Sequence, residues 1–369
     1  MIDNYGREIT YLRISVTDRC NFRCVYCMPE EGVPPKPHRS ILRYEEITRI
    51  ARLAVSLGVQ SIRVTGGEPL VRKGLGGLVA ALSGLKSQGL SDLSMTTNAS
   101  LLAPVARHLK AAGLDRVNIS LDTLRSDQFA RVTRGGNLAA VLEGAGAALA
   151  AGLSPVKVNV VATRNNIDEV QDFALFGMMT GLVVRFIELM PLGYAGSIQP
   201  ASFVDTADMM ERLERGGCVV EVAGVWPGSG PARNHIWTPR PGLVPSAHVM
   251  GAIQAVRAAS GGGPVGGWAG GPAGAQGMAM AAPDGAMLGF ITAISRHFCP
   301  GCNRLRLTAD GKIAPCLWSP DEIDLGTVMR AGASDEELKG VIQSAVTAKP
   351  LECRETRDVS RRRMSRLGG

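Results

Sequence analysis

The stretch YLRISVTDRCNFRCVYC, residues 11–27, joins a strand-like segment directly to a group of cysteines. Its first seven residues, Tyr11 to Thr17, are rich in β-branched and aromatic side chains, which favour a strand. Apolar residues at helical spacing follow between Tyr44 and Leu57. The two segments predict one strand–helix unit, with the cysteine loop at the carboxyl end of its strand.

The same alternation continues through the first half of the chain. We predict further strands at 61–65, 92–97, 116–121, 155–162 and 183–189, and further helices at 75–87, 101–112, 138–151 and 167–180. Parallel neighbouring strands need crossover helices, so this alternation predicts an α/β fold with a parallel sheet. Functional side chains are then expected at the carboxyl ends of the strands.

The pattern changes after about residue 195, where the alternation fades. Gly261 to Ala275 contains ten glycines and prolines in fifteen positions, and regular patterning returns at Leu288 to Ser295. Such composition is typical of a disordered segment. We therefore expect a domain at 1–220 and a smaller C-terminal region at 221–369, which includes a disordered insertion near 240–283.

Composition narrows the class of protein. Hydrophobic residues make up 45% and charged residues 20% of 369, which indicates a folded globular chain. The formal net charge of +7 favours anionic ligands. We find no basic and apolar leader and no uninterrupted apolar span, and so expect a cytoplasmic protein with no membrane association. Eight cysteines in a reducing compartment favour metal binding or catalysis over disulfides.

The first cysteine group is Cys20, Cys24 and Cys27, with the spacing C-x3-C-x2-C. Structural zinc requires four ligands, and the nearest further Cys or His is His38. A [4Fe-4S] cluster held by three thiolates instead leaves one iron open to a small molecule. This cluster is the favoured interpretation, and the alternatives are a zinc site with a remote ligand or three unconnected cysteines.

The second cysteine group is Cys299, Cys302 and Cys316. Cys218, Cys353 or His297 could complete a zinc site here. Because the first group also contains three cysteines, a second [4Fe-4S] cluster with an open iron is the favoured interpretation.

Three cations lie in strands that are otherwise apolar: Arg13, Arg63 and Lys157. An unpaired buried cation is costly, so an anion within the sheet is a better partner than water. Arg forks pair well with phosphate oxygens, which indicates a phosphate pocket. Structural salt bridges are the alternative for each cation taken singly.

The cysteine loop, followed one unit later by Gly66-Gly67-Glu68-Pro69, resembles the signature of the radical S-adenosylmethionine (SAM) superfamily. The resemblance implies a partial (β/α)6 TIM-type barrel in which the open iron binds SAM and reductive cleavage yields a 5′-deoxyadenosyl radical. The SAM contacts that it implies are Tyr26, Gly67, Glu68, Ser120 and Met190.

Both cysteine spacings, the run TDRCN at 17–21, the arginines after Cys302 and the terminal glycine pair resemble the GTP 3′,8-cyclase family. The resemblance implies that the radical removes hydrogen from C3′ of GTP, giving 3′,8-cyclo-7,8-dihydro-GTP in the first step of molybdenum cofactor (molybdopterin) biosynthesis. It also implies a second [4Fe-4S] cluster in the C-terminal region. The terminal residues Gly368 and Gly369 are implied to assist SAM cleavage. The implied GTP contacts are Arg13, Arg63, Thr96, Lys157, Arg304 and Arg306.

The family also implies partners. They are a reduced flavodoxin- or ferredoxin-type electron donor, a next enzyme (cyclic pyranopterin monophosphate synthase) and a second copy of the chain in a homodimer, with no nucleic acid. Alternatives are a radical SAM peptide-modifying maturase with an auxiliary cluster, a tRNA-modifying enzyme, and a non-enzymatic iron-sulfur or zinc regulator using the arginine-rich tail at 354–366. Two departures from the family pattern are Ser61, where a basic residue is common, and Ala99, where glycine is usual.

Overall fold

The computed structural model describes the chain apart from residues 33, 196–200, 223–229, 262–284 and 353–369. Most of the glycine-rich segment, the arginine-rich tail, Gly368 and Gly369 therefore lie outside the described residues.

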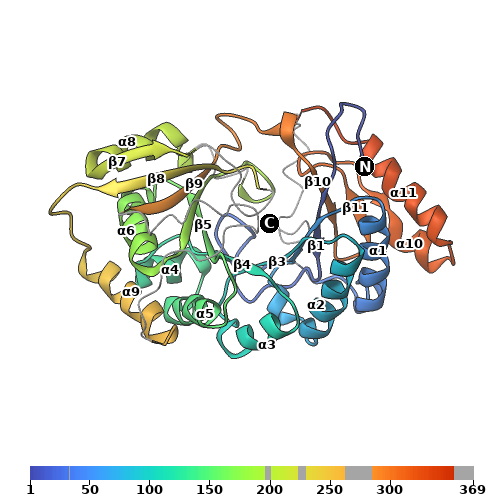
Figure 1. Cartoon of the computed structure of the whole chain (residues 1–369), viewed down its shortest axis with the longest axis horizontal. Coiled ribbons are helices and arrows are strands. Elements are labelled where there is room, and N and C mark those ends of the chain that lie inside the picture. Colours follow the sequence, from blue (N-terminus) through green and yellow to red (C-terminus); the bar gives the residue numbers. More distant parts are fainter. Residues whose placement is uncertain (33, 196–200, 223–229, 262–284, 353–369) are drawn as a thin grey trace.

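The predicted alternation forms the centre of a twelve-stranded sheet (Figure 1). Its six strands are parallel neighbours in chain order, and each boundary lies within two residues of the predicted one. They are β1 (Tyr11–Ser15), β2 (Ser61–Thr65), β3 (Asp92–Thr97), β4 (Arg116–Ser120), β5 (Lys157–Ala162) and β6 (Val183–Glu188). The prediction of a parallel α/β sheet is confirmed.

Strands from the second half of the chain extend this sheet at both edges. At one edge β10 (Arg304–Leu307) pairs in parallel with β1, and at the other β9 (Ala286–Ile291) pairs in parallel with β6. Antiparallel strands lie beyond each: β11 (Lys312–Ala314) and β12 (Ile323–Asp324) beyond β10, and β8 (Arg233–Pro239) and β7 (Gly217–Glu221) beyond β9. Both halves thus share one curved sheet, and the division at residue 220 stays a prediction.

Helices cover the convex outer side of this sheet (Figure 1). They are α1 (Tyr44–Ser56), α2 (Leu75–Ser83), α3 (Ala106–Ala111), α4 (Ser126–Thr133), α5 (Leu138–Ala150), α6 (Val170–Thr180), α8 (Thr206–Gly216), α9 (Ala247–Ala259), α10 (Leu325–Arg330) and α11 (Asp335–Thr347). In the described part of the chain, no helix is both long and apolar enough to span a bilayer.

Helix α9 corrects one expectation. The disordered insertion predicted near 240–283 is wrong for Ala247–Ala259, which form a helix packed on α5 and α6. A side chain at Gly146 in α5 would place its Cβ 2.4 Å from the carbonyl oxygen of Val256, so the two helices approach at a glycine. Val249, Ala252, Ile253 and Val256 are buried at helical spacing. The glycine-rich composition of the following segment obscured this pattern.

The two faces of the central strands differ in polarity. Residues such as Leu12, Ile62 and Val117 belong to the apolar core. The alternate positions carry Arg13, Arg63, Ser94, Arg116 and further polar residues. A parallel sheet covered on both faces normally has apolar residues on each. The polar inner face therefore indicates that the concave side of the sheet holds a polar ligand.

Candidate active site

The first cysteine loop packs closely on the Gly66-Gly67 pair. A Cβ at Gly67 would lie 2.3 Å from the carbonyl oxygen of Arg19, and one at Gly66 would lie 2.9 Å from that of Thr17. Gly67 N–H donates to Thr17 O (2.8 Å), and Glu68 N–H donates to Arg19 O (2.8 Å). The glycines therefore let the backbone that leads into Cys20 lie directly on the turn after β2. The SAM contact predicted for Gly67 stays a prediction.

The cysteines of this loop, Cys20, Cys24 and Cys27, are partly buried and form no disulfide. Burial raises the pKa of the Cys24 thiol well above its usual value, and the nearby Cys27, Asp122 and Cys20 raise it further. The three thiols therefore lie near one another. Within the described residues no three His, Cys, Asp or Glu side chains converge to hold a single metal ion. A cubane makes a different demand, because each thiolate ligates a separate iron, and three neighbouring cysteines at the end of a strand fit such a cluster.

Tyr26 connects this loop to the neighbouring strands. Its hydroxyl donates to Asp122 Oδ2 (2.5 Å), and the other oxygen of Asp122 accepts from Val161 N–H (2.8 Å). Burial raises the pKa of Asp122 to about 6 and that of Tyr26 well above its usual value. Tyr26 is therefore held over the ends of β4 and β5, where Ser120 also lies.

Glu68 is buried and accepts three hydrogen bonds from the protein itself. The donors are Leu70 N–H (3.0 Å), the Thr97 hydroxyl (2.7 Å) and Asn98 N–H (2.6 Å). Burial raises the pKa of this carboxyl to about 7. Glu68 thus joins the turn after β2 to the end of β3. The SAM contact predicted for it stays a prediction.

Buried cations lie side by side on the inner face of the sheet. Arg306, Arg13 and Arg63 are register partners on the neighbouring strands β10, β1 and β2. On the next strand, β3, Ser94 is the register partner of both Arg63 on β2 and Arg116 on β4. Lys157 and Arg185 continue this row on β5 and β6. Arg63, Arg306, Arg116, Lys157 and Arg185 are each no more than 9% exposed. We define the cation row as Arg13, Arg63, Arg116, Lys157, Arg185, Arg304 and Arg306.

Burial and mutual repulsion act on the side chains of the cation row. Burial, followed by repulsion from neighbouring arginines, lowers the pKa of Lys157 to about 5 and that of Arg185 to about 9. Arg116 makes a two-point ion pair with Asp92, at 2.7 Å for both contacts. Among the described residues, Arg63, Arg185 and Arg306 form no ion pair. A structural salt bridge therefore explains Arg116, which was not among the predicted site residues. It does not explain Arg63 or Arg306 in the described part of the chain.

Several polar atoms in this interior also lack partners. Nε and Nη1 of Arg306, Nε of Arg185 and the Thr96 hydroxyl make no hydrogen bond within the described structure. Unpaired buried donors are costly, and charge-assisted bonds to phosphate would satisfy the arginines. The interior is therefore suited to a polyanion.

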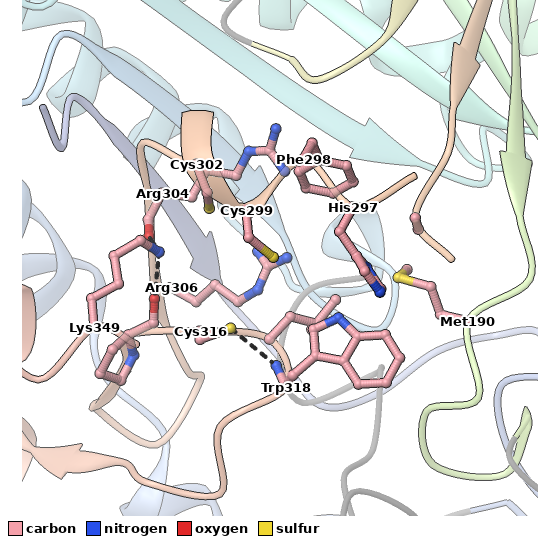
Figure 2. Close-up of a pocket in the computed structure, with 13 residues that line it drawn as sticks. Met190, His297, Phe298, Cys299, Cys302, Arg304, Arg306, Cys316, Trp318 and Lys349 are labelled. Carbon is pink, nitrogen blue, oxygen red and sulfur yellow. Dashed lines mark hydrogen bonds between the residues drawn. The ribbon is translucent and has the colours of Figure 1, made fainter. Parts of the chain in front are cut away.

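The second cysteine group lines a cavity at the β10 side of the sheet (Figure 2). The cavity has a volume of about 50 Å³ and opens to solvent. Figure 2 shows the sulfur atoms of Cys299, Cys302 and Cys316 with Lys349 on one side and His297 and Met190 on the other. Three sulfurs around a shared cavity fit a cubane. Met190, which we predicted as a SAM contact, lines this second cavity.

The candidates for a fourth zinc ligand separate in the structure. Cys218 is exposed on β7, which lies at the opposite edge of the sheet from β12 and does not line the cavity. Cys353 lies outside the described residues. His297 does line the cavity. Arg304 and Arg306 line it as well, so the cation row reaches the second cysteine group.

Lys349 is a residue of this site that sequence reasoning missed. Its side chain is buried, and Nζ donates to the carbonyl oxygens of Arg304 and Pro315, both at 2.9 Å. Burial acts to raise the pKa of Cys302, but the nearby Lys349 and Arg304 outweigh it and lower that pKa. Lys349 follows Cys316 by 33 positions, and no local motif marks it.

Arg116, Arg185, Asn118 and Asn159 were also missed, although a signal for them existed. Each occupies the alternating inner position of an apolar strand, as Arg13 and Arg63 do. Asn118 is completely buried, and both polar atoms of its amide lack a partner in the described structure.

Two family models match the chain. The model of the radical SAM superfamily matches residues 14–177, and the model named Molybdenum Cofactor Synthesis C matches residues 272–354. Together they cover the first cysteine group with β2 to β5, and the second group with β9 to β11.

Similar proteins agree with these matches. A GTP 3′,8-cyclase of Pelotomaculum thermopropionicum is 46% identical over 375 aligned positions that span both chains completely. One from Heliobacterium modesticaldum is 46% identical over 95% of this chain and 94% of its own. Among solved structures, SuiB of Streptococcus suis bound to S-adenosylmethionine has a similar fold, with a TM-score of 0.54 and 17% identity over 91% of this chain and 68% of its own. The chain belongs to the radical SAM superfamily and, within it, to the GTP 3′,8-cyclase family.

Proposed function

We propose that the protein is a radical SAM lyase that converts GTP to 3′,8-cyclo-7,8-dihydro-GTP in the first step of molybdenum cofactor biosynthesis. The observation that carries the proposal is the cation row, which lines the inner face of the sheet and reaches the second cysteine group. Family membership supplies the reaction, and the cation row supports a triphosphate as the substrate's anionic part.

The first cysteine group would hold a [4Fe-4S] cluster and SAM. When both are bound, reductive cleavage of SAM would supply a 5′-deoxyadenosyl radical able to take the hydrogen from C3′ of GTP. Tyr26, Gly67, Glu68, Ser120 and Met190 are the proposed SAM contacts. Asp122 fixes Tyr26 through a 2.5 Å hydrogen bond, so the aromatic ring keeps one orientation beside the cluster loop.

The cation row would bind the triphosphate. Arg13, Arg63, Lys157, Arg304 and Arg306 are the predicted contacts, and the structure adds Arg185 as a neighbour of Lys157. Arg forks can each present two N–H groups to phosphate oxygens. Thr96 would donate its unpaired hydroxyl to the same ligand. Because these groups are buried, a bound nucleotide would be held in place with little water around the reacting atoms.

The second cysteine group would hold another [4Fe-4S] cluster and position the purine. Cys299, Cys302 and Cys316 leave one iron open in such a cluster. Phe298 and Trp318 line the same cavity and would limit the orientations of a flat base. The nucleotide would thus be fixed at its base and at its phosphates, with the ribose between them.

The remaining proposals concern partners and location. We expect a reduced flavodoxin- or ferredoxin-type protein to supply electrons and cyclic pyranopterin monophosphate synthase to take the product. We also expect a homodimer, a cytoplasmic location and no nucleic-acid partner. Gly368 and Gly369 are proposed to assist SAM cleavage. Deleting both should abolish cyclisation while both clusters stay bound, and unchanged turnover would refute that role.

Anaerobic incubation of the reconstituted protein with SAM, reductant and GTP tests the main proposal. Mass analysis should detect 5′-deoxyadenosine and a cyclised nucleotide in equal amounts. Deoxyadenosine and methionine with unaltered GTP would show that the radical chemistry is right and the substrate is wrong. About eight irons per chain are expected for two cubanes.

A further inference from the structure

Lys349 lies at a junction between the last described helix and the second cysteine group. It follows α11 directly and is only 2% exposed. Its ammonium donates to the carbonyl oxygens of Arg304 and Pro315, which lie close in sequence to Cys302 and Cys316 respectively. The lysine therefore ties together the two loops that present these cysteines.

Lys349 also lies near the sulfurs of the second cysteine group. A charged lysine has three N–H donors, and the two carbonyls accept from two of them. Lys349 lines the same cavity as Cys302 and Cys316, and in Figure 2 its chain runs along one wall of that cavity. Burial lowers the pKa of Lys349, and the nearby Cys302 and Cys316 act to raise it. A buried amine thus lies beside two of the three cysteines.

The charges near the first cysteine group differ. Burial raises the pKa of Cys24, and Cys27, Asp122 and Cys20 raise it further. Burial and Glu68 raise the pKa of Cys20, whereas Arg23 acts to lower it. Arg23 donates two hydrogen bonds to the carbonyl oxygens of Cys20 and Phe22. Hydrogen bonds to sulfur and nearby charge are two of the factors that set the potential of an iron-sulfur cluster.

We propose that Lys349 is a positioning residue that raises the reduction potential of the cluster at Cys299, Cys302 and Cys316. A cluster gains one negative charge when it accepts an electron, and a fixed buried cation beside its sulfurs stabilises that reduced form. The second cluster is then easier to reduce than it would be without this lysine. The inference rests on the proposed second cluster site.

The test is a redox titration of the second cluster alone. The full-length chain carrying Cys20→Ala, Cys24→Ala and Cys27→Ala is reconstituted anaerobically, and iron content and electron paramagnetic resonance are measured. We expect Lys349→Met to lower the ratio of reduced to oxidised cluster at a fixed potential by about tenfold, which is about 59 mV for one electron. Lys349→Arg keeps the charge and should stay within about twofold of the parent.

Arg7→Met combined with Asp3→Asn is the matched structural control. Arg7 donates to the carbonyl oxygens of Cys299, Pro350 and Leu351, so it anchors the same segment. Its own charge is paired with Asp3 at 2.6 Å, and the double variant removes this pair without changing the net charge. The double variant should therefore loosen the segment with a shift of less than about twofold in the same ratio.

Three results would overturn the inference. They are an unchanged potential in Lys349→Met, an equal fall in Lys349→Arg, and an equal fall in the Arg7→Met, Asp3→Asn double variant. If Lys349→Met does not fold, Lys349→Gln replaces it as the uncharged variant. Absence of iron from the parent with an intact second group would instead refute the proposed site itself, and iron content reports this before any potential is measured.

Discussion

The two cysteine groups share one local hydrogen bond but differ in the charges near their thiols. In each, a backbone N–H two residues further along donates to a cysteine sulfur at 3.4 Å: Phe22 to Cys20 and Trp318 to Cys316. The pKa of Cys24 is raised by burial and by anionic neighbours, whereas that of Cys302 is lowered because Lys349 and Arg304 outweigh burial. The charges near these two thiols therefore distinguish groups that share the same local hydrogen bond.

The largest expected effect separates the two groups by function. Cys24→Ala should abolish formation of 5′-deoxyadenosine, because the cluster that binds SAM is lost. Cys316→Ala should retain SAM cleavage but yield no cyclised nucleotide, since the purine loses its site. Each variant should hold about four irons per chain, measured together with product analysis. Deoxyadenosine from the Cys24 variant would contradict this division.

A second prediction tests the cation row beside the second group. Arg306→Met should weaken GTP binding by about 1.5–3 kcal/mol, or roughly 10-fold to 100-fold, the range for hydrogen bonds to charged groups. Equilibrium dialysis measures the affinity. Arg131→Met is the control, because Arg131 is an exposed residue of α4 that pairs with Asp127. Similar affinities of the two variants would show that Arg306 does not contact the nucleotide.

A third prediction concerns the proton that Lys157 takes up when GTP binds. Burial lowers the pKa of Lys157 to about 5, so this lysine is neutral at pH 7 in the free protein. A bound triphosphate raises that pKa again, so GTP binding takes up about one proton near pH 7. Affinity should therefore fall as pH rises above 5, by up to about tenfold per pH unit, until the pKa of the complex is reached.

Calorimetry in buffers of different ionisation enthalpy measures this uptake. Lys157→Met should take up about one proton fewer than the parent, since protons bound by GTP itself are common to both. Equal uptake by the two proteins would show that Lys157 is already charged before the nucleotide arrives.

The smallest expected effect concerns Ala99, which follows β3. It has a φ of 60°, a left-handed conformation that costs a residue with a Cβ about 1–2 kcal/mol. Ala99→Gly relieves this strain. It also loses a buried methyl group and increases the conformational entropy of the unfolded chain, and both effects oppose the gain. We therefore expect the free energy of unfolding to stay unchanged or to rise by up to about 1 kcal/mol. Ala80→Gly, at an exposed position within α2, should lose about 0.5–1 kcal/mol. Equal losses in denaturant titrations would show that Ala99 is not strained.

Local patterns predicted the parts of the fold that local forces decide. The strand–helix alternation gave β1 to β6 within two residues, and cysteine spacing located both groups. The pairing of β10 with β1 and of β9 with β6 could not be predicted in this way. Those strands lie more than 90 residues from their partners in the chain, and no local propensity specifies such a pairing.

The candidate site shows the same limit. Arg13 and Arg63 were found because single charges in apolar strands are conspicuous, and the same rule applied to Arg116 and Arg185 would have found them too. Lys349 gave no such signal. Its importance comes from a contact between the end of α11 and loops more than 30 residues away in sequence, which only tertiary structure reveals.

The most direct test of the different roles of the two cysteine groups is to add SAM or GTP to two cysteine variants and to compare their cluster spectra. Cys316→Ala protein keeps the first cluster alone, and Cys24→Ala protein keeps the second alone. We predict that SAM changes the electron paramagnetic resonance spectrum of the first protein only and that GTP changes that of the second only. A GTP-induced change confined to the Cys316 variant, or no response to GTP in the Cys24 variant, would contradict the account.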